Sequence, residues 1–203
     1  MIDRYFNNKH SVVFPRAKRL GHHGVFPLDL KNACNELLQE KGIEGLERLE
    51  LSRRKGEGDH DFLERVHGEL SSSLRRGVPP MIQLRSYAAL RDKQGSSKVM
   101  WQATNNHFVV VTRVPAVLRE QDGGFAIDLI DPNGGRLLTA YVFGERHLPF
   151  RAEKSTSSPA SPEWLTGRPF LLVKAPGVVS LQPHKATWED RVIVTLSEAI
   201  GRF

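Results

Sequence analysis

The chain has 203 residues, of which 39% are hydrophobic and 26% are charged, so we expect one folded domain with appendages rather than a disordered or multidomain protein. No apolar run approaches the roughly 20 residues that a membrane-spanning helix needs, and residues 1–10 lack the apolar segment of a secretory signal. We therefore expect a soluble protein in the cytoplasm, without a membrane span.

The single cysteine, Cys34, excludes an intrachain disulfide and a thiolate metal cluster. The formal net charge of +6 arises from basic clusters that we interpret as solvated faces, because no aromatic side chains alternate with them. Nucleic acid is therefore not the expected partner. The histidines near the start of the chain have no carboxylate at metal-ligand spacing, so neither a metal nor another cofactor is expected.

Two amphipathic helices are predicted in the first half of the chain, after an N-terminal arm over residues 1–23. The first begins near Asp29, a candidate cap, and ends at Gly42. The second covers residues 59–76 and ends at Gly77. The apolar positions of the first helix, at helical spacing, are Leu30, Ala33, Cys34, Leu37 and Leu38.

From residue 81 onwards the pattern changes to strands separated by turns rich in glycine and proline. An exposed loop is predicted over residues 151–168. The predicted strands cover residues 81–87, 99–103, 107–114, 125–130, 136–143 and 170–174.

A C-terminal extension over residues 176–203 is predicted to contain a further helix. Its start is a capping box at 187–190, and its apolar positions are Val192, Ile193, Leu196 and Ile200. Helices followed by an antiparallel sheet favour an α+β fold, with the helices packed on one side of the sheet. The main domain of this arrangement covers residues 24–175.

His107 opens one strand of a predicted hairpin, and Asp131 closes the next strand. If the hairpin is centred near residue 119, the two side chains lie directly opposite each other. A carboxylate that holds an imidazole in one tautomer leaves the second ring nitrogen free to take a proton from a nucleophile. The alternative is that both are ordinary residues at a strand end and a turn.

Three segments together resemble papain-like cysteine peptidases of the bacteriocin-processing, double-glycine type. They are Gly77–Gln83, then Asn106–Thr112 with its His-Phe-Val-Val-Val run, then Ile127–Gly134 with its Asp-Pro turn. The resemblance implies a papain-like fold, a bacterial thiol protease, and a peptide or protein as substrate or ligand. Carried over by position, it makes His107 the catalytic histidine and Asp131 the acid that orients it.

The family's cysteine-bearing helix is expected upstream of residue 24, yet residues 1–23 contain no cysteine. Cys34 is then the one candidate thiol nucleophile, but it shares a helix face with leucines, and this position is more typical of a small core residue. Two hypotheses stand nearly level, ahead of a third, a basic interaction protein whose arms at 1–23 and 176–203 contact a partner or polyanion. One is a peptidase or amide hydrolase with a Cys34–His107–Asp131 mechanism. The other is an inactive peptide-binding or regulatory domain whose nucleophile has been lost or lies on a missing N-terminal segment. The oligomeric state and the substrate are not predicted.

Overall fold

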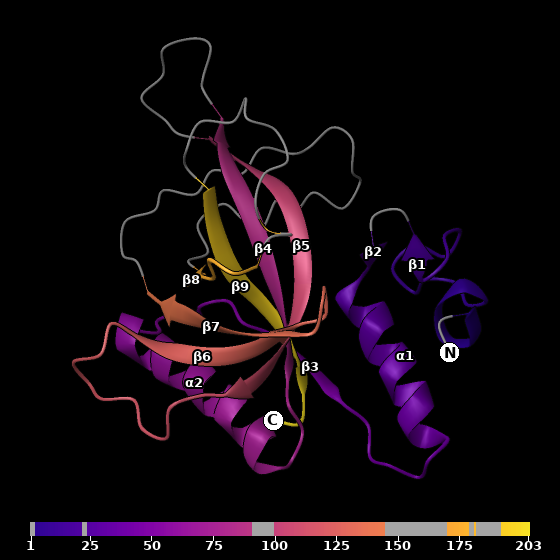
Figure 1. The fold of residues 1–203 in the computed structure, drawn as a ribbon, viewed down its shortest axis with the longest axis horizontal. Helices are drawn as coiled ribbons and strands as arrows, with labels where there is room; N and C mark the ends of the chain where they lie inside the picture. The colour runs from indigo at the N-terminus through magenta and orange to yellow at the C-terminus, as the bar shows by residue number, and fades with distance from the viewer. Residues whose placement is uncertain (1–2, 22–23, 91–99, 145–169, 179–180, 182–191) are drawn as a thin grey trace.

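The structure is a computed structural model, and it describes residues 3–21, 24–90, 100–144, 170–178, 181 and 192–203. Its centre is an antiparallel barrel of six strands in the spatial order β9-β4-β5-β6-β7-β8, which closes because β8 also pairs with β9 (Figure 1). The barrel strands are β4 (Met81–Leu90), β5 (Met100–Arg113), β6 (Gly124–Asp131), β7 (Arg136–Phe143), β8 (Leu171–Lys174) and β9 (Val192–Gly201).

The remaining elements lie outside the barrel. A seventh strand, β3 (Glu47–Glu50), pairs with the end of β9. The two α-helices are α1 (Pro27–Gln39) and α2 (Asp59–Arg75). A short π-helix, η1 (Asp3–Asn7), and a small hairpin of β1 (Leu20–Gly21) and β2 (Gly24–Val25) precede α1.

The expected α+β, papain-like fold, with helices packed on one side of an open sheet, is wrong. The strands close on themselves into a barrel, and the core consists of the inward-facing residues of this barrel together with one face of α2. Alternation along each strand explains this arrangement: in β6 the buried residues Phe125, Ile127 and Leu129 point inward, while Ala126 and Ile130 are exposed.

The predicted C-terminal helix is also wrong in its described part, because residues 192–201 form strand β9. Spacing misled the prediction: β9 is buried on both faces, and a strand of that kind carries apolar residues without strict alternation. The β-branched run from Val192 to Thr195 was the signal in favour of a strand. The capping box at 187–190 and the loop predicted at 151–168 lie outside the described residues.

Other boundaries differ less. The two strands predicted at 99–103 and 107–114 are one strand, β5, with residue 99 outside the described part. The charged segment between the helices contains β3, which the sequence analysis missed because its four residues, Glu-Arg-Leu-Glu, show no strand pattern. Phe26, not Asp29, occupies the cap position of α1, which begins with Pro27 in its first turn.

Helix α2 contributes one face to the barrel core. Phe62, Leu63, Val66 and Leu70 are buried and join the cluster that includes Val109 of β5. Each such side chain stabilises the fold by about 1.5–3 kcal/mol relative to its exposed state. The core therefore holds α2 against the barrel, as Figure 1 shows below β6.

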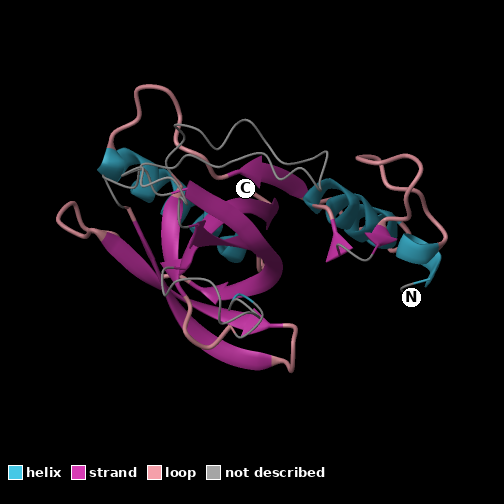
Figure 2. Ribbon diagram, turned by 90° about the horizontal axis from the view of Figure 1, so that it is seen from above, coloured by secondary structure: helices cyan, strands magenta, loops and turns pink. Residues whose placement is uncertain are grey.

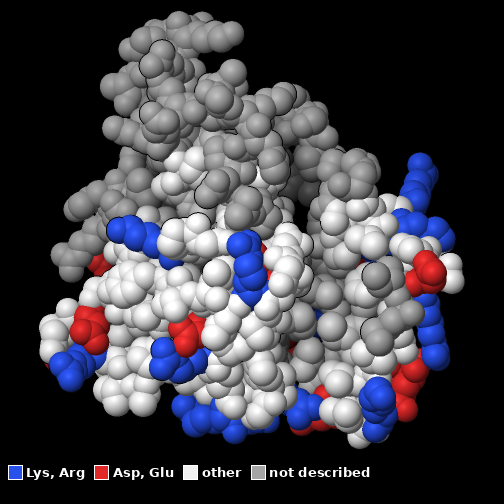
Figure 3. Space-filling view, in the orientation of Figure 1, with Lys and Arg blue, Asp and Glu red and all other residues white. Residues whose placement is uncertain are grey.

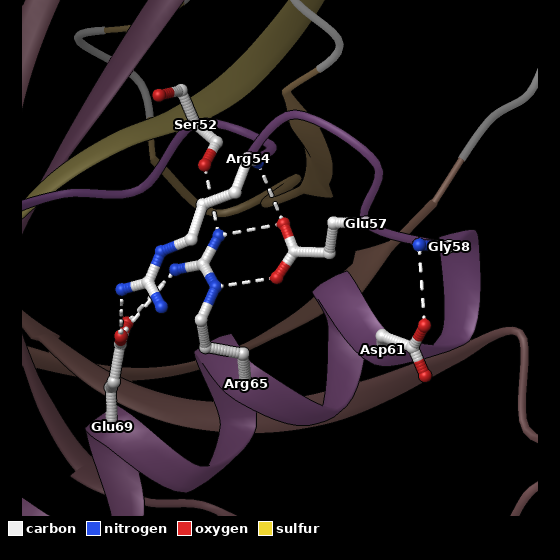
Figure 4. A network of polar contacts seen from close by, with 7 residues as sticks. All are labelled: Ser52, Arg54, Glu57, Gly58, Asp61, Arg65 and Glu69. Atoms are coloured by element: carbon white, nitrogen blue, oxygen red, sulfur yellow. Dashed lines mark hydrogen bonds and ion pairs between the residues drawn. The ribbon is translucent and has the colours of Figure 1, made fainter.

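The polar face of α2 is tied to the preceding loop by Arg65 (Figure 4). The Arg65 guanidinium donates to Glu57 at 2.6 Å through Nε and to the Ser52 carbonyl at 2.8 Å, and it reaches Glu69 one turn along the helix. Asp61 accepts from the Gly58 N–H at the start of α2. These contacts fix residues 52–58 on the helix surface.

The N-terminal unit, which we define as residues 3–21 with β2 and α1, lies to one side of the barrel (Figures 1 and 2). It contacts β3 and β9 through α1, but it contributes no residue to the described core cluster. Buried Asp29 holds the arm by accepting from Ser11 Oγ at 2.5 Å and from the Val12 N–H at 2.8 Å. The arm predicted as irregular is therefore folded against α1.

Candidate functional site

His107 lies near one end of the inward-facing row of β5. The next inward residues, Val109 and Val111, are fully buried in the core, whereas the His107 side chain keeps 11% of its surface exposed. Its direct partner on β4 is Leu84, also a core residue. The imidazole is thus packed at the rim of the barrel interior, with a limited opening to solvent.

Asp131 is the last residue of β6 and continues the inward row of that strand. Its side chain is 1% exposed, and Oδ1 lies 2.7 Å from Nε2 of His107. The same oxygen accepts the main-chain N–H of Asn133 at 2.9 Å, within the turn that leads to β7. The β6–β7 turn therefore positions the carboxylate, and the carboxylate positions the imidazole.

The two side chains meet by a different register from the one expected. Val110 lies opposite Ile130 and Val111 lies opposite Leu129, so the register extends to Val109 opposite Asp131. His107 is two residues further along β5 and is a diagonal neighbour on the same face, within reach of a long side chain. An irregularity between Val111 and Arg113 shifts the register by one residue, from Arg113 opposite Asp128 to Val111 opposite Leu129, and this shift brings His107 and Asp131 onto the same face.

Among the described residues, one ring nitrogen of His107 has a hydrogen-bond partner and the other has none. Nε2 faces Asp131, and no described residue hydrogen-bonds Nδ1. With an ionised carboxylate as acceptor, the proton resides on Nε2, and Nδ1 is the basic nitrogen. This arrangement allows proton transfer at Nδ1 to or from a bound group.

A pair of hydroxyl groups lies further along the same strands. Ser86 Oγ and Thr104 Oγ1 are 2.7 Å apart where a bulge interrupts the β4–β5 ladder, and Ser86 is fully buried. The sequence analysis missed this pair, since neither residue stands in a recognisable motif. Neither hydroxyl hydrogen-bonds His107, so the pair is not a nucleophile for the imidazole in this structure.

Two asparagines precede His107 on β5. Asn106 is exposed and accepts from Nε of Arg85 at 2.8 Å across the strand pair. Asn105 lies opposite Ser86 at the bulge. Because neighbouring residues of a strand alternate between its faces, Asn106 lies on the face opposite to His107.

Cys34 lies in the middle of α1, in the N-terminal unit, and not at a helix N-terminus. Its side chain is half-buried, and burial raises the pKa of the thiol, which disfavours the thiolate. No contact joins Cys34 to His107 or Asp131 among the described residues. The structure therefore brings together two of the three predicted site residues and leaves the third apart.

The basic clusters of the sequence are partly neutralised. Arg53 is paired with Asp59, and Arg54 lies 3.5 Å from Glu69. Figure 3 shows positive and negative side chains beside each other at several places on the face in view. Within the described ranges, no group of three histidine, cysteine or acidic side chains is arranged to hold a metal ion.

Comparisons of the chain with protein-family models, with characterised proteins and with solved structures found no match. Neither described α-helix has the apolar length that a membrane crossing requires.

Proposed function

We propose that the chain is a polypeptide-binding domain of the peptidase type, in which His107 and Asp131 keep the arrangement of an acid–base pair and Cys34 is not a nucleophile. The observation that carries the proposal is that the histidine–carboxylate pair and the thiol lie apart. Nε2 of His107 is 2.7 Å from a buried carboxylate, while the one thiol is half-buried on α1. The motifs around His107 and Asp131, which resemble papain-like peptidases, support the same conclusion.

The geometry supports a proton-transfer role at the barrel rim. Asp131 fixes the orientation and the tautomer of the imidazole, so that Nδ1 is the nitrogen that can accept a proton. A bound amide next to Nδ1 would be hydrogen-bonded there. Without a nucleophile beside it, the pair binds and orients the amide but does not cleave it.

A hydrolase with a Cys34–His107–Asp131 mechanism is the second candidate, and the short His107–Asp131 contact favours it. It requires the thiol of Cys34 to reach His107 and to ionise readily, whereas burial raises the pKa of that thiol. Its substrate is a peptide or protein in the cytoplasm, as the sequence predicts.

The rate at which iodoacetamide labels Cys34, measured from pH 6 to pH 9, separates the two functions. We expect slow labelling that increases only toward alkaline pH and is equal in the wild type and in a His107→Ala variant, because the thiol has no imidazole partner. Cys34→Ser measures the background. Fast labelling below pH 7 that slows in His107→Ala would refute the proposal and establish a Cys–His pair.

A further inference from the structure

Strand β5 is paired with β4 over many more residues than with β6. Strand β4 pairs with it from Val110 to Met100, whereas β6 pairs with it only from Val110 to Arg113. No described strand lies along the other edge of β5 from Ala103 to Phe108. Figure 1 shows β4 and β5 extending beyond β6 and β7, with β5 on the flank of the barrel turned toward α1.

The hydrogen-bond pattern identifies the main-chain groups on this open edge. The Val111 N–H donates to the Pro80 carbonyl at 2.9 Å, so Val111 turns its main-chain groups toward β4. In an antiparallel ladder, residues alternate in this respect, and the register is regular from Val110 to His107. His107 and Val109 therefore bond to β4, while Asn106 and Phe108 direct their N–H and C=O groups to the open edge.

Among the described strands, the outer edge of β3 and the open edge of β5 differ in how they are protected. Strand β3 has the sequence Glu-Arg-Leu-Glu, and charged residues of this kind discourage another strand from pairing. The segment from 103 to 109, Ala-Thr-Asn-Asn-His-Phe-Val, contains no charged residue and no proline. The charged sequence of β3 therefore discourages pairing at its edge, whereas the edge of β5 beside His107 has no charged residue or proline that would do so.

We propose that the edge of β5 from Ala103 to Phe108 is a docking site for an extended polypeptide segment, which pairs with Asn106 and Phe108 as an additional strand. A polypeptide main chain is the occupant because it alone offers alternating donors and acceptors at the spacing of a strand. Docking there places a peptide group beside His107. This inference rests on the proposed function and names how its ligand binds.

Amide hydrogen exchange, followed residue by residue by NMR, tests the open edge. In the free protein, the amides of Asn106 and Phe108 exchange fast and those of His107 and Val109 exchange slowly. The probe is a pool of acetylated, amidated hexapeptides randomised at every position. At about ten times its Kd, exchange at Asn106 and Phe108 slows about tenfold, because only the free fraction exchanges. Slow exchange at both residues in the free protein, or no slowing with the pool, would overturn the inference.

Matched variants distinguish edge pairing from binding by side chains. Asn106→Pro removes an N–H that does not bond to β4, so the strand persists but protection by the pool is lost. Asn106→Ala keeps the N–H and retains protection, as does His107→Ala. Loss of protection in Asn106→Ala or His107→Ala would overturn edge pairing, whereas rapid, His107-dependent labelling of Cys34 would refute the proposed function alone. A pool N-methylated at alternate residues is expected to give no protection.

Discussion

One carboxylate oxygen of Asp131 accepts two hydrogen bonds, from Nε2 of His107 and from the N–H of Asn133. The carboxylate is almost fully buried, so its removal would leave both N–H donors without their acceptor. Asp131 therefore has a structural role in the β6–β7 turn as well as its role toward the imidazole.

Replacing Asp131 with alanine is expected to lower the free energy of unfolding by about 1–3 kcal/mol, because two hydrogen bonds to a buried carboxylate are lost. Asp131→Asn keeps a carbonyl oxygen at the same place, and its loss should be clearly smaller. Urea unfolding of the three proteins measures the difference. Equal losses in the two variants would contradict the hydrogen-bond account.

From the sequence, His107 and Asp131 could be identified as candidate site residues, but the contact between them could be predicted only in part. The His-aromatic-Val-Val-Val run and the Asp-Pro turn drew attention to His107 and Asp131, and the structure places them in contact. The register that joins them was not predictable, because it depends on an irregularity near Arg113 that no residue type announces. The catalytic roles of both residues stay predictions.

The Arg65 network contains two carboxylates, Glu57 in the loop before α2 and Glu69 in α2, whose pKa values move in opposite directions. The hydrogen bond from Arg65 lowers the pKa of Glu57, whereas burial raises the pKa of Glu69 despite the same guanidinium. Glu57 therefore stabilises the fold at pH values above its ordinary pKa, and this contribution is lost as the pH falls through the lowered value. Glu69 acts with the opposite sign, since its charged form is disfavoured by folding.

Variants of these two residues should consequently show opposite pH dependence. Glu57→Gln is expected to lower the free energy of unfolding at pH 7, with a difference from wild type that shrinks toward pH 4. Glu69→Gln is expected to be more stable relative to wild type at pH 7 than at pH 4. Denaturant unfolding at both pH values provides the test, and changes of the same sign in both variants would contradict the assignment.

Helices and hairpin strands could be located from sequence because their signals are local. The second helix was predicted to end at Gly77, and α2 ends at Arg75; the strand predicted at 136–143 is β7 with the same bounds. Strand β9 was not found, because its burial on both faces depends on distant partners, β4, β8 and β3. A segment of that kind carries no period that separates strand from helix.

The whole molecule consists of a barrel with its own core and an N-terminal unit held mainly by polar contacts. Arg19 is buried and donates to the Tyr5 carbonyl at 3.1 Å and to Glu36 at 2.7 Å, a contact that lowers the pKa of Glu36. No residue of this unit enters the described core cluster. The unit is therefore expected to open without unfolding of the barrel.

Asp29→Ala should increase amide exchange over residues 9–19, because the arm loses its bonds from Ser11 and Val12, and leave exchange in β4 and β5 unchanged. Arg4→Ala, which removes an exposed pair with Glu40, should have a much smaller effect. Exchange measured by mass spectrometry resolves the two regions. Equal increases in the arm and in the barrel would show one cooperative unit instead of two.

Barrel closure was the feature of the whole molecule that the sequence analysis did not predict. It depends on two short pairings between β8 and β9, Leu171 with Leu196 and Leu172 with Thr195. These residues lie 25 and 23 positions apart, and no hairpin turn signals their contact. Closure is a property of long-range pairing, which local patterns do not encode.

The tautomer of His107, read from the ¹⁵N chemical shifts of its ring, tests the central claim most directly. For the neutral imidazole, the account predicts a proton on Nε2 and none on Nδ1 in the wild type, because Asp131 accepts at Nε2 and no described residue engages Nδ1. The preference should weaken in Asp131→Ala. A neutral imidazole with its proton on Nδ1, or averaging between the two tautomers like that of a solvent-exposed histidine, would contradict the acid–base pair on which the proposed function rests.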